Sequence, residues 1–172
     1  MSSAAEITRL AVAALLTAVL AWAAISDVRQ RRIPNWTVLA VIGLFVPWAV
    51  AHAWTWDAWA LGAGAVALLL SFGLYAAGLI GAGDSKLFAA CALMVGIGDL
   101  AWLTLATAVA GGVIALISLV SRPTRALVMI NMRAKGDFGR GIPYGVAIAA
   151  AATALVWLAV LKLPVAHLLG RA

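Results

Sequence analysis

Long apolar runs dominate this chain, and they restrict what it can fold into. Most of them reach the roughly 20 residues that a helix needs to cross a bilayer core. Lipid offers no hydrogen-bond partner to an open strand edge, so each run must be helical. The sequence therefore predicts an all-α, polytopic membrane helix bundle with about six transmembrane helices. The runs cover approximately residues 7–26, 36–54, 58–80, 86–98, 100–120 and 142–162.

Composition supports a membrane protein and argues against a soluble domain. Hydrophobic residues make up 66% of the 172 residues and charged residues 10%, whereas soluble domains are about half apolar and about a quarter charged. We expect one membrane domain over residues 1–172.

Cys91 is the single cysteine, which excludes an intramolecular disulfide and a Cys-x-x-Cys metal site. The short run 86–98 predicts either a tilted or thinned span or one half of a hairpin with the next run.

Basic residues are concentrated on one side of the predicted bundle. With both termini outside (N-out/C-out), nine of the twelve Lys and Arg residues lie in inner connections, as the positive-inside rule requires. The net charge of +6 therefore indicates membrane orientation, and we expect no nucleic-acid partner. Trp54, Trp56 and Trp59 suit an outer aromatic belt. The nine inner residues are Arg29, Arg31, Arg32, Lys86, Arg122, Arg125, Arg133, Lys135 and Arg140.

Two aspartates stand at the ends of apolar runs, and this orientation puts both on the cytoplasmic side. Asp27 lies in Ser26-Asp27-Val28-Arg29-Gln30, and Asp84 lies in Gly81-Ala82-Gly83-Asp84-Ser85-Lys86. A carboxylate at or near bilayer depth is costly, which makes it a candidate functional group. The other acids, Glu6, Asp57 and Asp99, are read as helix caps or interface anchors, and Asp137 as part of a solvated basic connection over residues 121–141.

Residues that interrupt helices accompany each aspartate. Pro34 suits the opening turn of the second helix, where its missing N–H costs nothing, and Asn35 follows it. Gly81 and Gly83 tolerate unusual backbone dihedrals, so we expect them to unwind the chain ahead of Asp84 and to admit a substrate main chain. Asp84 then lies near a helix N-terminus, where the dipole favours an anion. The two carboxylates are thus predicted to face one polar cleft.

Such a pair has a definite chemistry. Two carboxylates in one low-dielectric site do not both ionise easily, so the pair holds one proton. The ionised group can then take a proton from water while the protonated group polarises a scissile carbonyl. We expect no cofactor and no metal, and His52 and His167 map to the outer side. Lys86 is expected to extend its side chain to the membrane interface. The alternative is that it tunes the Asp84 carboxylate, although residues two apart do not lie on the same face of a helix.

At these residues the sequence resembles the type IV prepilin peptidases, a family of Gly-x-Gly-Asp membrane aspartyl proteases. The resemblance rests on Asp27 with Ile33-Pro34-Asn35, on Gly81-Ala82-Gly83-Asp84-Ser85-Lys86-Leu87, and on Ile142-Pro143-Tyr144-Gly145. It implies a peptidase of the bacterial cytoplasmic (inner) membrane that removes a short basic leader from pilin-type precursors at the cytoplasmic face. It also implies that Asp27 and Asp84 are catalytic, that Gly81 and Gly83 shape the site, and that pilus or secretion assembly proteins are partners.

One departure from the pattern of the prepilin peptidases indicates which branch of that family the chain resembles. Long members of the family carry an additional cytoplasmic section with paired Cys-x-x-Cys motifs and methylate the new N-terminus. With one cysteine, this chain looks like the short, peptidase-only branch associated with Flp-type (tight adherence) pili. Two other classes stay open: a proton- or ion-coupled carrier, which favours acids near mid-span and repeated broken helices, and a non-catalytic subunit of a secretion machine.

Overall fold

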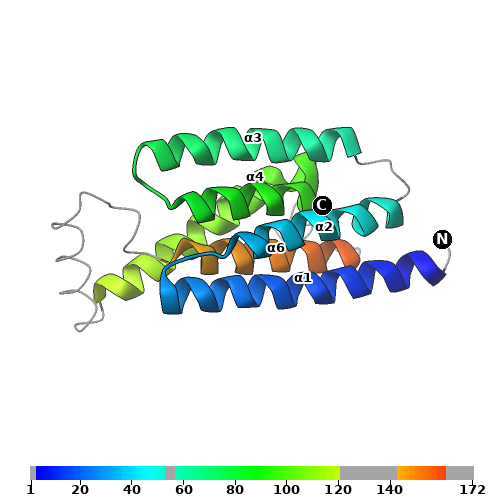
Figure 1. Ribbon diagram of the computed structural model, residues 1–172, viewed down its shortest axis with the longest axis horizontal. Helices are drawn as coiled ribbons and strands as arrows, with labels where there is room; N and C mark the ends of the chain where they lie inside the picture. Colours follow the sequence, from blue (N-terminus) through cyan, green and yellow to red (C-terminus); the bar gives the residue numbers. More distant parts are fainter. Residues whose placement is uncertain (1–2, 53–56, 121–142, 162–172) are drawn as a thin grey trace, which may run out of the picture.

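The protein is a helix bundle in the described part of the chain. The structure, a computed structural model, describes residues 3–52, 57–120 and 143–161. Within these ranges it contains five α-helices and no strand, which confirms the all-α prediction for this part (Figure 1). The helices are α1 (Ser3–Gln30), α2 (Asn35–Ala51), α3 (Asp57–Ala76), α4 (Ala82–Val120) and α6 (Tyr144–Val160).

Three of these helices, α1, α3 and α4, are long and apolar enough to cross a membrane. The other two, α2 and α6, are apolar but have only 17 residues each. Several long apolar helices agree with the predicted membrane protein. The count of six spans and the N-out/C-out orientation stay predictions.

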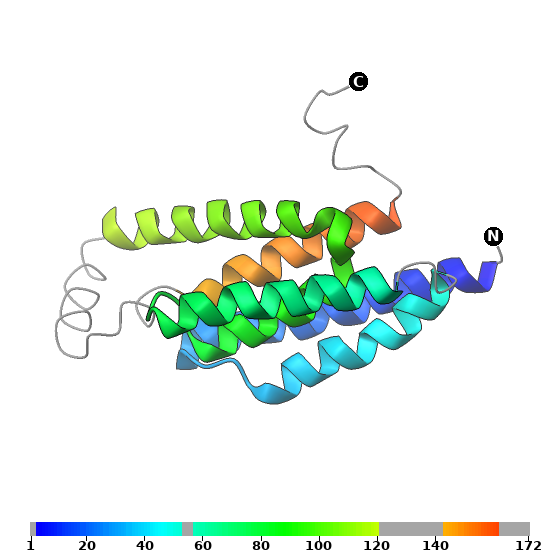
Figure 2. The same cartoon turned by 90° about the horizontal axis from the view of Figure 1, so that it is seen from above.

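The predicted runs 86–98 and 100–120 are both contained in α4. Gly96 interrupts this helix with φ 76° and ψ 177°, a conformation that glycine adopts readily because it lacks a Cβ. Figure 2 shows a turn within α4, so that its two parts run in opposite directions. The short run is therefore one half of a hairpin, which was one of the two predicted alternatives.

The helix predicted over residues 58–80 ends before the apolar run does. In the structure α3 stops at Ala76. The N–H of Leu79 donates to the carbonyl of Leu74 at 2.9 Å, and the N–H of Gly78 donates to that of Tyr75 at 2.9 Å. Gly78 has φ 74°. These features are a Schellman motif, in which a glycine in the left-handed conformation ends the helix.

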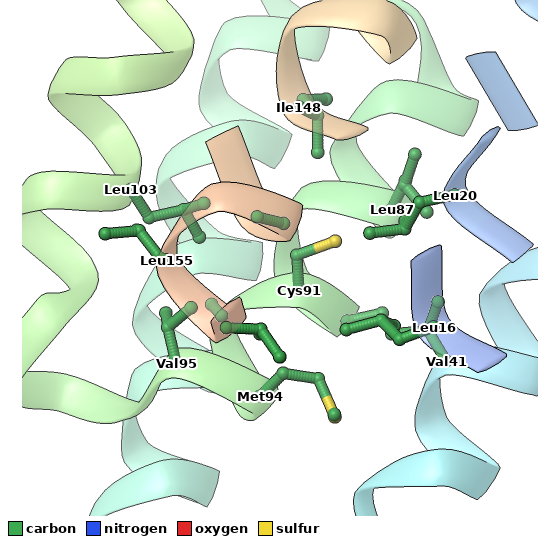
Figure 3. Close-up of a cluster of buried hydrophobic side chains, with 14 of the residues drawn as sticks. Leu16, Leu20, Val41, Leu87, Cys91, Met94, Val95, Leu103, Ile148 and Leu155 are labelled. Atoms are coloured by element: carbon green, nitrogen blue, oxygen red, sulfur yellow. The ribbon is translucent and has the colours of Figure 1, made fainter. Parts of the chain in front are cut away.

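The core forms where α1, α4 and α6 meet, with Leu16, Leu20, Leu87 and Ile148 buried around Cys91 (Figure 3). Cys91 is 1% exposed, in keeping with its interpretation as a small packing residue. Helices also approach closely at Gly64 and at Gly111. A Cβ on Gly64 would lie 2.5 Å from Leu93 Cδ2.

A Cβ on Gly111 would lie 3.1 Å from Tyr144 Cε1, whereas Gly62 and Gly112 have nothing within 4 Å. Of these four glycines, Gly64 and Gly111 are the two at which helices approach closely.

Most helix ends that flank the described connections lie on one side of the bundle. There α1 and α3 finish and α2, α4 and α6 begin, and the second part of α4 also ends on that side (Figures 1 and 2). Near the other end, the Arg9 side chain donates to the carbonyl oxygen of Ala51 at 2.7 and 3.2 Å and joins α1 to α2. The predicted tryptophans Trp54 and Trp56, and the basic connection 121–141, lie outside the described residues.

Candidate active site

A polar cavity of about 280 Å³ opens where α1 ends and where α2 and α4 begin. Both aspartates singled out in the sequence line it, although 57 positions separate them along the chain. The predicted site residues Gly81, Gly83, Lys86 and Asn35 line it too. The full lining is Asp27, Arg31, Arg32, Ile33, Asn35, Gly81, Ala82, Gly83, Asp84 and Lys86.

Asp27 lies in the last turn of α1 and is only 6% exposed. Its Oδ2 accepts a hydrogen bond from the backbone N–H of Gly145 at 2.8 Å. Gly145 is the second residue of α6, and the preceding Pro143 makes no side-chain cap for that helix. Because the first N–H groups of a helix lack partners within it, Asp27 serves as the cap of α6. The helix dipole favours a negative charge at this position.

The chain reverses after Gln30, the last residue of α1, to start α2 at Asn35. The Arg31 N–H donates to the carbonyl of Asp27 at 2.9 Å, and Arg31 has φ 52°. The Ser26 hydroxyl donates to the carbonyl of Arg32 at 2.8 Å and holds the turn. A non-glycine residue in this left-handed region costs about 1–2 kcal/mol, so surrounding contacts must stabilise the turn. Arg31 and Arg32 both line the cavity.

Pro34 acts as the N-cap residue of α2, with φ −63° and ψ 136°. Its carbonyl accepts the N–H of Thr37 at 3.0 Å and the Thr37 hydroxyl at 2.7 Å. Pro34 is not among the residues that line the cavity. Its part in the site is to begin α2 where it places Asn35 at the cavity wall.

Asp84 lies in the first turn of α4 and is 8% exposed. Its Oδ2 accepts the N–H of Gly81 at 3.1 Å, three residues back. An acidic residue that reaches back to the amide before a helix is one half of a capping box. The other oxygen, Oδ1, is buried and has no hydrogen-bond partner among the residues described. One oxygen of Asp84 therefore caps α4, and the second is left without a partner among the described residues.

The expected role of the two glycines before Asp84 is wrong in part. In the described residues, positive φ values among glycines occur at Gly78 and Gly96 and not at Gly81 or Gly83. Gly83 is helical, so the chain is not unwound directly ahead of Asp84. The reason for glycine is steric. A Cβ on Gly81 would lie 2.9 Å from Asp84 Oδ2, and one on Gly83 would lie 3.2 Å from Ile33 Cβ.

A pair of buried serines stands beside Asp84. Ser71 of α3 and Ser85 of α4 are each 3% exposed, and their hydroxyl oxygens lie 2.8 Å apart. The Ser71 hydroxyl also lies 2.6 Å from the carbonyl oxygen of Ala67 in its own helix. The contact between the two serine hydroxyls joins α3 to the first turn of α4, which carries Asp84.

Lys86, one of the predicted site residues, lines the same cavity as Asp84, although a spacing of two argued against a shared helix face. Sequence reasoning missed other residues of this site. Arg31 and Arg32 were read mainly as orientation signals, and Ile33 and Ala82 as parts of motifs. The Gly145 amide was missed as a partner of Asp27; its motif Ile142-Pro143-Tyr144-Gly145 was noted, but no local signal links it to Asp27.

Within the described ranges, no three His, Cys, Asp or Glu side chains gather closely enough to hold a metal ion. The cavity instead offers two carboxyl groups and three cationic side chains. Two carboxyl groups at one polar cavity can share a proton and exchange it with a water molecule.

A sequence model of the type IV leader peptidase family matches residues 14–116, which is more than half of the chain. The chain belongs to the type IV leader peptidase family. The predicted resemblance is thereby confirmed, and so is the broad prediction of a protease. No curated protein and no solved structure matched the chain.

Membership in the type IV leader peptidase family, with several long apolar helices, makes this an integral membrane peptidase. The matched range contains Asp27, Asp84 and both site glycines. It ends before Gly145, so the residue that donates to Asp27 lies outside it.

Proposed function

We propose that this protein is a membrane-embedded aspartyl endopeptidase that uses Asp27 and Asp84 as its catalytic pair. The observation that carries the proposal is that both carboxyl groups, although largely buried, line one polar cavity. Burial of two unpaired charges would be costly, so a shared proton is the favourable state of the pair. Family membership supports the same reaction class.

In the proposed reaction, a water molecule between the two aspartates attacks the scissile peptide carbonyl. The ionised carboxylate takes a proton from this water, and the protonated partner donates a hydrogen bond to the carbonyl oxygen. The proton then passes to the leaving amine, which breaks the C–N bond. This cycle needs no covalent intermediate. The unpartnered Oδ1 of Asp84 supports it, because that buried oxygen has no hydrogen-bond donor among the described residues, and a water or a substrate would supply one.

The proposed substrates are pilin-type precursors, cut after a short basic leader and directly before an apolar helix. A cavity at the end of a bundle of apolar helices suits a cut at the membrane interface. We propose the cytoplasmic face of the bacterial inner membrane for it, because the positive-inside rule puts Arg29, Arg31 and Arg32 there. We also propose a peptidase-only enzyme of the Flp-pilus branch, without methyl transfer.

The test is cleavage of a pilin-type precursor by purified protein in detergent or liposomes. Asp27→Asn and Asp84→Asn keep side-chain shape but remove the base and the exchangeable proton. General acid–base groups usually contribute about 100- to 10,000-fold, so each variant should lose well over tenfold in rate. Asp57→Asn and Asp99→Asn serve as matched controls and should cleave at near wild-type rates.

Cleavage close to the wild-type rate by Asp27→Asn or Asp84→Asn, at normal membrane abundance, would refute the catalytic assignment. It would favour a non-catalytic subunit. Ion transport that depends on both aspartates, without any cleavage, would favour a carrier.

A further inference from the structure

Gly145 is the one residue of α6 whose backbone amide contacts an aspartate of the proposed catalytic pair. Its N–H donates to Asp27 Oδ2 at 2.8 Å across 118 positions of sequence, and the contact is buried. A short hydrogen bond to a buried carboxylate is of the stronger, charge-assisted kind when that carboxylate is ionised. The amide therefore restrains Oδ2 of Asp27. Because the carboxyl group is rigid, this restraint also fixes the direction of Oδ1.

The position of Gly145 leaves no room for a side chain. A Cβ there would lie 2.8 Å from Asp27 Oδ2, 2.9 Å from Ile33 Cδ1 and 3.1 Å from Asp27 Cβ. Gly145 has no positive φ, so backbone conformation does not explain the glycine. Absence of a side chain is what allows the first turn of α6 to approach Asp27 closely.

A second contact keeps α6 in the required register along α1. Trp157 Nε1 donates to the Thr17 hydroxyl at 3.0 Å. Thr17 precedes Asp27 by ten residues and Trp157 follows Gly145 by twelve, so the two helices run antiparallel with a matched register. This contact lies about three turns from the cavity. It supports the approach of α6 without touching the aspartate.

We propose that Gly145 is a positioning residue of the peptidase, which lets the N-terminus of α6 hold the Asp27 carboxylate in its reactive orientation. This inference rests on the proposed function, because it assigns Asp27 to catalysis. It adds α6, outside the range matched by the family, to the catalytic machinery. It also separates two reasons for glycine: Gly145 makes room for a catalytic side chain, whereas Gly111 makes room for a neighbouring helix.

The direct test is Gly145→Ala, with Gly112→Ala as its matched control. Gly112 is helical, and a Cβ there meets nothing within 4 Å. Ordinary contact distances begin at 3.4 Å, so the new methyl group must displace Asp27 by roughly 0.6 Å or more. Misplacing a reacting group by about 1 Å can cost about 100-fold in rate. We expect Gly145→Ala to lose about 100-fold in kcat with KM for the precursor changed little, and Gly112→Ala to stay within about twofold.

Ile33→Val in the Gly145→Ala background separates positioning from packing. This second change removes Ile33 Cδ1 and leaves the contact with Asp27. Activity should stay low if displacement of Asp27 is the cause. Recovery of near wild-type kcat in the double variant would show that simple crowding was responsible and would overturn the proposal.

A measurement independent of cleavage covers the case in which Gly145→Ala fails to fold. In protein labelled with 15N-glycine, Asp27→Asn should shift the Gly145 amide resonance more than any other glycine resonance, because it weakens the acceptor of that N–H. An unchanged Gly145 resonance would overturn the proposal. So would rapid cleavage by Gly145→Ala when Asp27→Asn is inactive, and that result would leave the proposed function intact. Absence of cleavage by the wild-type protein would instead refute the proposed function and this inference with it.

Discussion

The serine pair beside Asp84 yields a stability prediction whose size follows from its geometry. The single proton of the Ser71 hydroxyl is best used toward the Ala67 carbonyl, the nearest acceptor at 2.6 Å. The Ser85 hydroxyl then donates to Ser71 across 2.8 Å. Ser71→Ala would leave the Ser85 hydroxyl without this acceptor at a position only 3% exposed.

Leaving a buried polar group unsatisfied costs about 1–3 kcal/mol in soluble proteins. Hydrogen bonds between membrane helices average about 0.6 kcal/mol and reach about 1.7 kcal/mol, because the unfolded chain in the membrane also finds partners. The burial of both serines favours the upper part of that range. We expect Ser71→Ala to lower the free energy of unfolding by about 1–1.5 kcal/mol. The combined variant Ser71→Ala and Ser85→Ala should cost less than the sum of the single changes, since it removes both polar groups.

The assay is reversible unfolding in mixed micelles, titrated with SDS and followed by helical circular dichroism for the wild type, both single variants and the double variant. Thr104→Ala is the control, because the Thr104 hydroxyl donates to Leu100 within its own helix at 2.8 Å; it should cost under about 0.5 kcal/mol. Strictly additive single effects, or no measurable cost for Ser71→Ala, would refute the reasoning. That outcome would mean that Ser85 rotates to another acceptor.

Three further predictions concern topology and mechanism. In a Cys91→Ser background, a membrane-impermeant reagent should label Asp57→Cys from outside and Lys135→Cys only after permeabilisation; reversed labelling would contradict the N-out orientation. The purified enzyme should cleave without transferring a methyl group from S-adenosylmethionine and in the presence of chelators; labelled product, or activity restored by zinc, would contradict the peptidase-only aspartyl assignment. The double variant Asp27→Asn and Asp84→Asn should be little slower than either single variant, because groups that act as a unit are not additive; multiplied losses would indicate independent roles.

Much of this fold follows from signals that act within a few residues. Long apolar runs in lipid leave helices as the available structure, and the described helices follow those runs closely. The cap formed by Asp84 on the Gly81 amide also depends on residues three apart, so the sequence Gly81-Ala82-Gly83-Asp84 indicates a helix start. Gly78 in the Schellman motif was a readable signal of the same kind, but the apolar residues Leu79 and Ile80 obscured it.

Local signals could not decide which helices meet at the site. The contact of Gly145 with Asp27 joins residues 118 positions apart, and the close approach of Gly83 to Ile33 joins two separate helix starts. In a soluble helix an apolar stripe marks the buried face. Here exposed residues such as Leu69 are as apolar as core residues such as Leu87, so the pattern does not tell which face packs inward.

The sequence by itself determined the helices, the two aspartates and the family to which their motifs belong. Only the tertiary structure decided that α6 supplies an amide to Asp27, that Lys86 and Arg31 share a cavity with both carboxyl groups, and that glycine is required at 145 for space. The physical reason is that these contacts depend on how apolar surfaces of helices fit together. Fit depends on small residues and a few interhelical hydrogen bonds, and neither leaves a periodic trace in the sequence.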